Sequence, residues 1–181
     1  MQDVAAADAM VHLAATGDEV AFARLVAEHH AAMARVAYVI CGDAEITRDA
    51  VQAAWTTAWS RLRDVKEPSK VRAWLVAVAA NEARQAMRRQ RRVRLVDLAV
   101  ATDRIGGGDP ADGVAVADLA RALRGLKPED RSLLALRFVA GLDSTEIAAQ
   151  LGGSPSGVRS RLSRLIERLR SDLDVQDGPR P

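Results

Sequence analysis

The sequence predicts an all-α protein with two small helical domains, at residues 9–94 and 115–173, joined by a flexible acidic linker at residues 95–114. Apolar residues recur at steps of three and four in both domains, which is the helical period, and no alternating strand pattern is present. The linker is rich in Gly, Pro and Asp, which disfavour regular structure. With 181 residues, 49% of them hydrophobic, the chain has room for two small domains with packed cores.

Three helices are expected in the first domain. Asp18 is suited to cap the first, whose apolar residues run from Phe22 to Ile40. The second follows Gly42 and Asp43 and carries a broad apolar stripe over residues 46–62, opposite a more polar face. The third begins near Ser69 and runs into a cluster of arginines, with Trp74 expected in the core.

Four short helices are expected in the second domain, over residues 114–126, 128–140, 144–151 and 155 to about 173. Asp143 and Glu146 are three residues apart and resemble a capping box before the third of these helices. Two glycines then stop that helix, and Ser154 and Pro155 supply the start signals of the last one. The pattern indicates a helix, a tight turn and a second helix.

The charge of the chain is distributed as a basic, an acidic and a second basic segment. The formal net charge is only +2, but 23 of the 26 basic residues are Arg, the side chain best suited to bidentate contacts with phosphate and guanine. Residues 84–94 contain six Arg and no acid, residues 97–118 contain five Asp against one Arg, and residues 159–170 contain five Arg against one Glu. Each predicted domain therefore has its own arginine cluster near its last helix.

On the third helix, Asn81, Arg84, Arg88 and Arg91 are spaced three, four and three residues apart, which places them along one side. This stripe has the hydrogen-bonding reach to contact nucleic acid. The alternative is a solvated helix end, because cations also stabilise a helix C-terminus.

The last predicted helix fits the second helix of a helix-turn-helix, which lies in the major groove of DNA. Its apolar side leaves serines and arginines on the other side, where arginine can read guanine and serine can contact phosphate. The candidate DNA-binding residues are Ser154, Ser156, Arg159, Ser160, Arg161, Ser163 and Arg164. A helical hairpin with a solvated basic face is the alternative.

Four sequence segments resemble the extracytoplasmic-function (ECF) group of sigma-70 RNA polymerase sigma factors. The segments LDSTEIAAQLG at 142–152 and VRSRLSR at 158–164 resemble the promoter-reading fourth region of that family. DAVQ at 49–52, with Trp59, resembles its helix for binding core polymerase, and RAWL at 72–75, with Asn81 and Arg88, resembles its helix for the −10 element. The resemblance covers nearly the whole chain apart from the two tails.

The resemblance implies a transcription initiation factor with sigma regions 2 and 4, which binds core RNA polymerase, recognises the −35 and −10 promoter elements and assists promoter opening. It implies duplex promoter DNA, its opened single strand and an anti-sigma factor as partners. It assigns −35 recognition to the helix-turn-helix residues. Binding of the −10 element and opening would fall to Lys66, Ser69, Lys70, Asn81, Arg84, Arg88, Arg91 and Arg92, and core-polymerase binding to Asp49, Gln52, Ala53 and Thr56.

Several other functions are disfavoured by composition. The single cysteine, Cys41, and three scattered histidines provide no metal-ligand spacing, and we expect no metal, no cofactor and no catalytic site. The longest apolar run, residues 73–80, is too short to cross a membrane, and the N-terminus does not resemble a secretory signal, so we expect a cytoplasmic protein without membrane insertion. Two alternatives stay open: a helix-turn-helix regulator that binds operator DNA without polymerase, and a small enzyme acting on nucleic acid.

Overall fold

The structure is a computed structural model that describes residues 2–97 and 114–174, and these residues form helices and turns. The first part contains α1 (Gln2–Ala15), α2 (Glu19–Cys41), α3 (Ala44–Arg61) and α4 (Val71–Asp97), with two 3₁₀ turns, η1 (Leu62–Asp64) and η2 (Pro68–Lys70), between α3 and α4. The second contains α5 (Val114–Gly125), α6 (Pro128–Leu134), η3 (Ala135–Val139), α7 (Ser144–Leu151) and α8 (Pro155–Asp174). The predicted all-α fold class is confirmed.

Helices α1–α4, here called the N-terminal bundle, are defined by local signals at their ends. Asp18 caps α2 by accepting a 2.8 Å hydrogen bond from the backbone N–H of Ala21, as the sequence predicted. Gly42 ends α2 at a φ of +68°, a left-handed conformation that favours glycine, and its N–H donates to the carbonyl oxygen of Tyr38 at 2.7 Å. Asp43 then caps α3. The core of this bundle lies between α2, α3 and α4.

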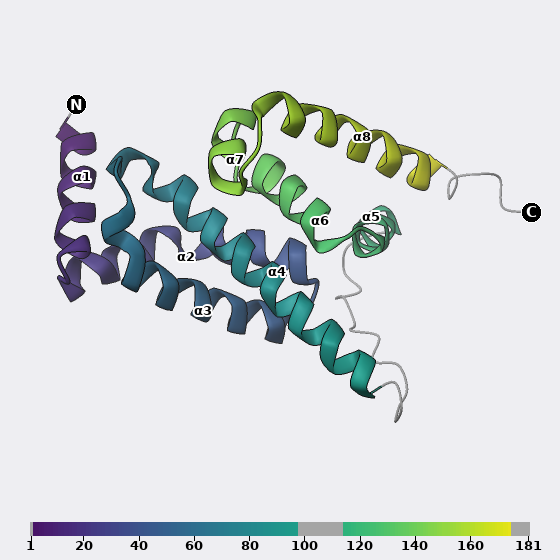
Figure 1. Cartoon of the computed structure of the whole chain (residues 1–181), viewed down its shortest axis with the longest axis horizontal. Helices are drawn as coiled ribbons and strands as arrows, with labels where there is room; N and C mark the ends of the chain where they lie inside the picture. Colours follow the sequence, from purple (N-terminus) through teal and green to yellow (C-terminus); the bar gives the residue numbers. More distant parts are fainter. Residues whose placement is uncertain (1, 98–113, 175–181) are drawn as a thin grey trace, which may run out of the picture.

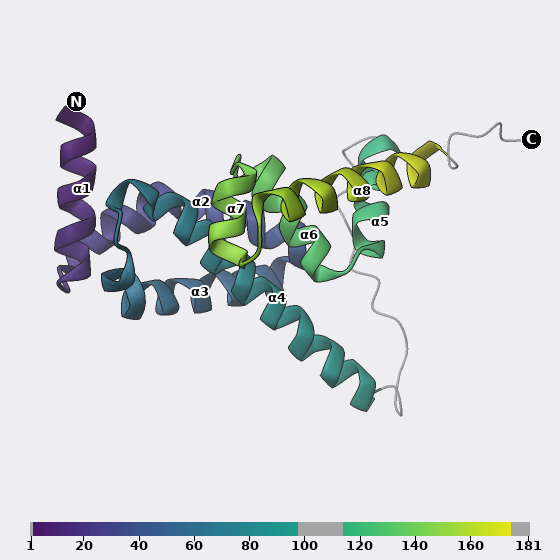
Figure 2. The same ribbon diagram turned by 45° about the horizontal axis from the view of Figure 1, so that its top comes forward.

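The first helix, α1, has no counterpart among the helices expected from sequence. Its residues are mostly alanine and small polar side chains, so its apolar periodicity is weak. It packs on α2 and on the two 3₁₀ turns, and it buries Val11 and Ala14. Both views in Figures 1 and 2 show it at the end of the molecule opposite the C-terminal end of α8.

Helices α5–α8, here called the C-terminal bundle, follow the predicted order with one difference. The single helix expected over residues 128–140 is α6 followed by a wider π-helical turn, η3, in which the N–H of Ala140 donates to the carbonyl oxygen of Ala135 at 2.9 Å. Phe138 is 62% exposed on this turn. Local sequence patterns do not distinguish a π-helical turn, whose N–H groups bond five residues back, from an α-helical turn, whose N–H groups bond four residues back.

The two bundles pack against each other. Helices α2 and α4 contact α6, and both also contact η3, while α4 also contacts α7; Figures 1 and 2 show α6 and α7 over α2 and α4. One hydrophobic cluster runs through both bundles, from Leu75 and Ala83 of α4 to Leu133 and Leu136. The guanidinium of Arg72 also donates a 2.8 Å hydrogen bond to a carbonyl oxygen 68 residues away.

The predicted linker at 95–114 falls mainly on residues 98–113, which lie outside the described residues; α4 extends through Asp97, and α5 begins at Val114. None of the helices described has the combination of length and hydropathy that a bilayer crossing requires.

Candidate nucleic-acid interface

Helices α7 and α8 form the helix-turn-helix that the sequence predicts. Asp143 accepts hydrogen bonds from the backbone N–H groups of Thr145 and Glu146, at 2.7 and 2.8 Å, while the Glu146 carboxylate accepts from the N–H of Asp143 at 2.8 Å. This is the predicted capping box. After α7, the turn uses two glycines at φ values of +78° and +112°, which L side chains rarely adopt.

Helix α8 has one buried and one exposed side. Val158, Leu162 and Leu165 are buried against the rest of the C-terminal bundle. All seven candidate residues for −35 recognition are exposed: Ser154, Ser156, Arg159, Ser160, Arg161, Ser163 and Arg164. Within this set, the Ser154 hydroxyl accepts a 3.1 Å hydrogen bond from the N–H of Gly157, so it caps the start of α8. The exposed side supplies hydroxyl and guanidinium donors, which suit phosphate and base edges.

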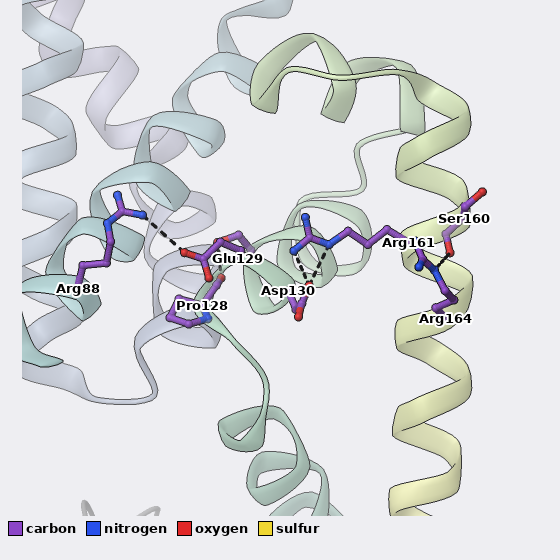
Figure 3. Close-up of polar contacts among 8 residues, drawn as sticks. Arg88, Pro128, Glu129, Asp130, Ser160, Arg161 and Arg164 are labelled. Atoms are coloured by element: carbon purple, nitrogen blue, oxygen red, sulfur yellow. Dashed lines mark hydrogen bonds and ion pairs between the residues drawn. The ribbon is translucent and has the colours of Figure 1, made fainter.

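Two of these arginines are held by contacts within the C-terminal bundle, as Figure 3 shows. The guanidinium of Arg161 donates from Nε and Nη2 to a single oxygen, Oδ1 of Asp130, at 2.9 and 2.6 Å. The Nε of Arg164 donates to the carbonyl oxygen of Ser160 at 3.3 Å. Asp130 lies at the start of α6, 31 residues before Arg161. These contacts orient two candidate DNA-binding side chains.

The arginine stripe of α4 lies partly against the C-terminal bundle. Asn81 and Arg84 are half-buried and joined by a 3.2 Å hydrogen bond from Nη2 of Arg84 to Oδ1 of Asn81, as their helical spacing allows. Arg88 is more exposed, and its Nη1 lies 3.6 Å from Oε1 of Glu129 in α6 (Figure 3). Arg91 and Arg92 are exposed. Burial lowers the pKa of Arg84, because it disfavours the charged form.

A cavity of about 280 Å³ lies between α4 and the helix-turn-helix. It is lined by Arg84 from α4, by Glu129 from α6, by the glycine turn and by Arg161 from α8. In this arrangement, one candidate residue for the −10 element and one for the −35 element face a common space.

The remaining −10 candidates lie at the other end of α4. Lys66, Ser69 and Lys70 are all exposed in and before η2, and Nζ of Lys70 lies 2.7 Å from a carboxylate oxygen of Glu67. At 1.5 Å rise per residue, Lys70 and Arg88 are separated by roughly 27 Å along the helix axis. The −10 candidates thus form an extended strip rather than a single pocket.

The candidate core-polymerase residues lie on α3. Asp49, Gln52 and Thr56 are exposed and Ala53 is half-buried. The Thr56 hydroxyl donates a 3.1 Å hydrogen bond to the backbone carbonyl oxygen of Gln52, which stabilises its position on the helix surface. The opposite side of α3 packs on α2 and α4. The structure therefore leaves the polar side of α3 accessible to a partner.

Sequence reasoning did not identify the acidic residues that contact the arginines. Glu129 and Asp130 each contact a candidate DNA-binding arginine, one from each bundle. No periodic pattern connects residues 31 or more positions apart, so only the concentration of acids next to Pro128 could have drawn attention to them. Trp74 was expected in the core, and it is partly buried against the hydrophobic cluster.

Among the described residues, no group of three or more His, Cys, Asp or Glu side chains could hold a metal ion. Cys41 is buried, and burial raises the pKa of its thiol to about 11. His29 is buried, which lowers its pKa, and His30 accepts a hydrogen bond from the indole N–H of Trp55 at 3.3 Å. These side chains are accounted for by packing and hydrogen bonding.

Two family models match the chain. Residues 25–93 match sigma-70 region 2, and residues 117–169 match sigma-70 region 4. The first match covers most of α2, all of α3 and α4 through residue 93, which includes nearly all of the arginine cluster, and the second covers the helix-turn-helix.

Curated relatives agree with this assignment. The chain is 31% identical to the probable RNA polymerase sigma factor RfaY of Xanthomonas campestris over 92% of its own length and 44% of that protein. It is 32% identical to the ECF RNA polymerase sigma factor SigE of Mycolicibacterium smegmatis, over 88% of its length and 65% of that protein. It is 31% identical to the sigma factor CnrH of Cupriavidus metallidurans, over 90% of its length and 91% of that protein. The chain thus spans about half to two thirds of the first two relatives and nearly all of the third.

Two solved structures share the fold. The structure of CnrH in complex with the cytosolic domain of CnrY matches with a TM-score of 0.69 and 29% identity, covering 93% of this chain and 97% of that one. The sigma factor RpoE of Bartonella quintana, in complex with the anti-sigma factor NepR, matches with a TM-score of 0.70 and 23% identity, covering 85% and 97%. Both matches extend across the two bundles. The chain therefore belongs to the sigma-70 family of RNA polymerase sigma factors, and within it to the extracytoplasmic-function group.

Proposed function

We propose that the chain binds core RNA polymerase and directs it to promoters by reading the −35 element with α8. The observation that carries this proposal is the exposed side of α8, where Ser and Arg side chains follow a capped helix and a three-residue turn. The N-terminal end of such a helix enters the major groove. Arg159 and Arg164 supply guanidiniums for guanine or phosphate, and Ser156 and Ser160 supply hydroxyl groups.

Recognition of the −10 element and strand opening fall to the strip on η2 and α4. Opening requires that a base leaves the stack and is held outside the duplex, at a cost of a few kcal/mol. The amide of Asn81 and the cations at Lys66 and Lys70 are exposed or half-exposed and suit base edges and phosphates. Arg88, Arg91 and Arg92 extend this strip with further positive charge, which attracts the DNA backbone.

Core polymerase binds the polar side of α3, where Asp49, Gln52 and Thr56 are exposed. These residues lie on α3 and the arginine stripe lies on α4, so we expect polymerase and DNA to be bound at the same time. Polar complementarity at such an interface sets orientation and specificity more than affinity. Region 2 and region 4, at 9–94 and 115–173, then serve as two DNA-reading modules joined by the segment at 95–114.

An anti-sigma factor is the regulatory partner, and the protein acts in the cytoplasm. The support for the first statement is the fold shared with a sigma factor solved together with an anti-sigma factor. The support for the second is that a protein acting on core polymerase and chromosomal promoters works where these are present. The polymerase contributes nucleotidyl transfer, and this chain contributes recognition.

Reconstituted transcription tests the proposal. The purified chain, added to sigma-free core polymerase and genomic DNA fragments, should produce discrete start sites that core polymerase alone does not produce. Arg159→Ala should weaken binding of the upstream element, whereas Asn81→Ala should mainly slow strand opening. Arg168→Ala is the matched control, because Arg168 lies on α8 but pairs with Asp172 beyond the candidate surface.

The result that would overturn the proposal is start-site choice identical with and without the chain. Tight, sequence-specific binding by the isolated chain, with no effect on polymerase, would instead support a regulator that acts without polymerase.

A further inference from the structure

Arg131 of α6 is a buried cation without a counterion among the described residues. Its side chain is only 4% exposed, it makes no hydrogen bond or ion pair there, and its Nε is fully buried without a partner. Removing a charged guanidinium from water costs several kcal/mol unless an opposite charge or hydrogen-bond acceptors replace the solvent. The position of Arg131 between the bundles therefore requires an explanation.

The neighbours of Arg131 do not supply the missing negative charge. The Cys41 thiol is close, but its pKa of about 11 keeps it neutral near pH 7. The carboxylate of Glu129 stabilises the charged form of Arg131, but it is also paired with the guanidinium of Arg88. Arg91 adds a further positive charge in the vicinity. Burial is the largest effect on Arg131, and it lowers the pKa of this guanidinium by disfavouring the charged form.

Arg131 lines a cavity of about 120 Å³ between the C-terminal end of α2 and helices α5 and α6. Arg124, a second arginine, and Tyr38 line the same cavity. The aliphatic part of Arg124 lies over Gly42, where an added Cβ would come within 3.9 Å of its Cγ. None of the described residues that line the cavity carries a carboxylate. It has room for several water molecules or for one small polyatomic ion.

We propose that this cavity is a binding site for a small phosphate-class oxyanion, held between the guanidinium groups of Arg131 and Arg124. Guanidinium groups match the geometry of phosphate oxygens and form charge-assisted hydrogen bonds to them. Tyr38, which also lines the cavity, carries a phenol hydroxyl that can donate a further hydrogen bond. The ligand is either free phosphate or the phosphate group of a small phosphomonoester, since both present the same oxygens.

Binding at this site would favour the packed arrangement of the two bundles. Tyr38 and Gly42 come from the N-terminal bundle, whereas Arg124 and Arg131 come from the C-terminal bundle. A ligand that binds only the packed arrangement stabilises it by mass action. This regulatory consequence, unlike the site itself, rests on the proposed function, in which Arg84 and Arg161 contact DNA, whereas the packed arrangement brings both to one cavity.

Equilibrium dialysis of the full chain against radiolabelled inorganic phosphate, at constant ionic strength with chloride as the replaced anion, tests the site. The expected result is saturable binding of one phosphate per chain. Arg124→Gln should weaken it about tenfold or more, the usual effect of losing a hydrogen bond to a charged group. Arg131→Met should abolish it. Arg168→Gln, an exposed arginine elsewhere, should bind like the original chain and controls for net charge.

Thermal unfolding provides a second readout. Phosphate should raise the unfolding midpoint of the original chain and of Arg168→Gln, but not that of Arg131→Met. Without phosphate, Arg131→Met should be at least as stable as the original chain, because an uncompensated buried charge is replaced by an apolar side chain of similar length. If Arg131→Met does not fold, the phosphate binding of Arg124→Gln tests the proposal instead. Arg124 is exposed, so its replacement should leave the fold intact.

Adenosine monophosphate identifies the source of the phosphate group: if it displaces the radiolabel, the site takes phosphomonoesters, and if it does not, the site takes the free ion. Absence of saturable phosphate binding, or equal binding by Arg131→Met and the original chain, would overturn the proposal. These measurements contain neither polymerase nor DNA, so their failure would leave the proposed function untouched.

Discussion

Asp130 holds Arg161 through one oxygen: Oδ1 accepts hydrogen bonds from both Nε and Nη2 of the guanidinium. The carboxylate side chain is 14% exposed and the arginine 48% exposed, so the pair is less screened by solvent than a typical surface ion pair. Both residues belong to the C-terminal bundle. The pair therefore does not depend on how the two bundles are arranged, and the charge of Arg161 is already partly compensated before DNA arrives.

This pairing predicts unequal roles for two neighbouring arginines of α8. Arg159 has no ion pair among the described residues. Arg159→Ala should cost about 1–3 kcal/mol in −35 duplex binding by the holoenzyme, measured by fluorescence anisotropy. The double change Asp130→Asn with Arg161→Gln, which keeps the net charge, should cost less. An equal or larger loss for the double variant would show that Arg161 is a principal contact.

The contact between Arg88 and Glu129 predicts a small, salt-sensitive effect. Both side chains are about half exposed, and such pairs contribute at most about 1 kcal/mol. Glu129→Gln should raise the affinity of the isolated chain for single-stranded −10 DNA by no more than about fivefold. The gain should shrink at high salt, because ions screen exposed charges.

Glu167→Gln, on the exposed side of α8, is the control for loss of a negative charge. Equal gains for the two variants would mean that the effect comes from net charge rather than from release of Arg88. A filter-binding titration at low and high salt separates the two explanations.

The capping box at the start of α7 predicts a measurable loss of stability. Asp143→Ala removes the acceptor for two backbone N–H groups and should lower the free energy of unfolding by about 1 kcal/mol. Urea denaturation followed by circular dichroism measures this. Glu146→Gln should cost less, because its amide oxygen can still accept from the N–H of Asp143. Equal losses in the two variants would contradict this account of the cap.

Because the Cys41 thiol is buried, we expect the free energy of unfolding to decline in alkaline solution. Burial raises its thiol pKa from 9.0 to about 11, so the folded protein retains a proton that the unfolded chain loses. The contribution of Cys41 is therefore complete below about pH 9 and is lost as pH rises toward about 11. Urea midpoints of the original chain and of Cys41→Ala should diverge less at high pH than at neutral pH. A pH-independent difference between them would contradict the assignment.

Sequence patterns predicted those features that depend on neighbours a few positions away. The Asp18 cap and the capping box follow from spacings of three residues, and so does the placement of Asn81 and Arg84 on one side of α4, although their mutual hydrogen bond was not predicted. The contact of Arg72 with the carbonyl oxygen of Ala140 spans 68 positions, and nothing in the local pattern of either residue indicates it. For the same reason, the acids that hold Arg88 and Arg161 emerged only from the packing of α6.

The shared hydrophobic cluster has a kinetic consequence. Leu75 and Ala83 belong to the same cluster as Leu133 and Leu136, so moving the bundles apart would uncover apolar surface to water. Such a separation is a unimolecular step with its own barrier. If this separation must precede docking on polymerase, the observed rate constant of holoenzyme assembly should level off as polymerase concentration increases. Its maximum should equal the rate constant at which the two bundles separate spontaneously.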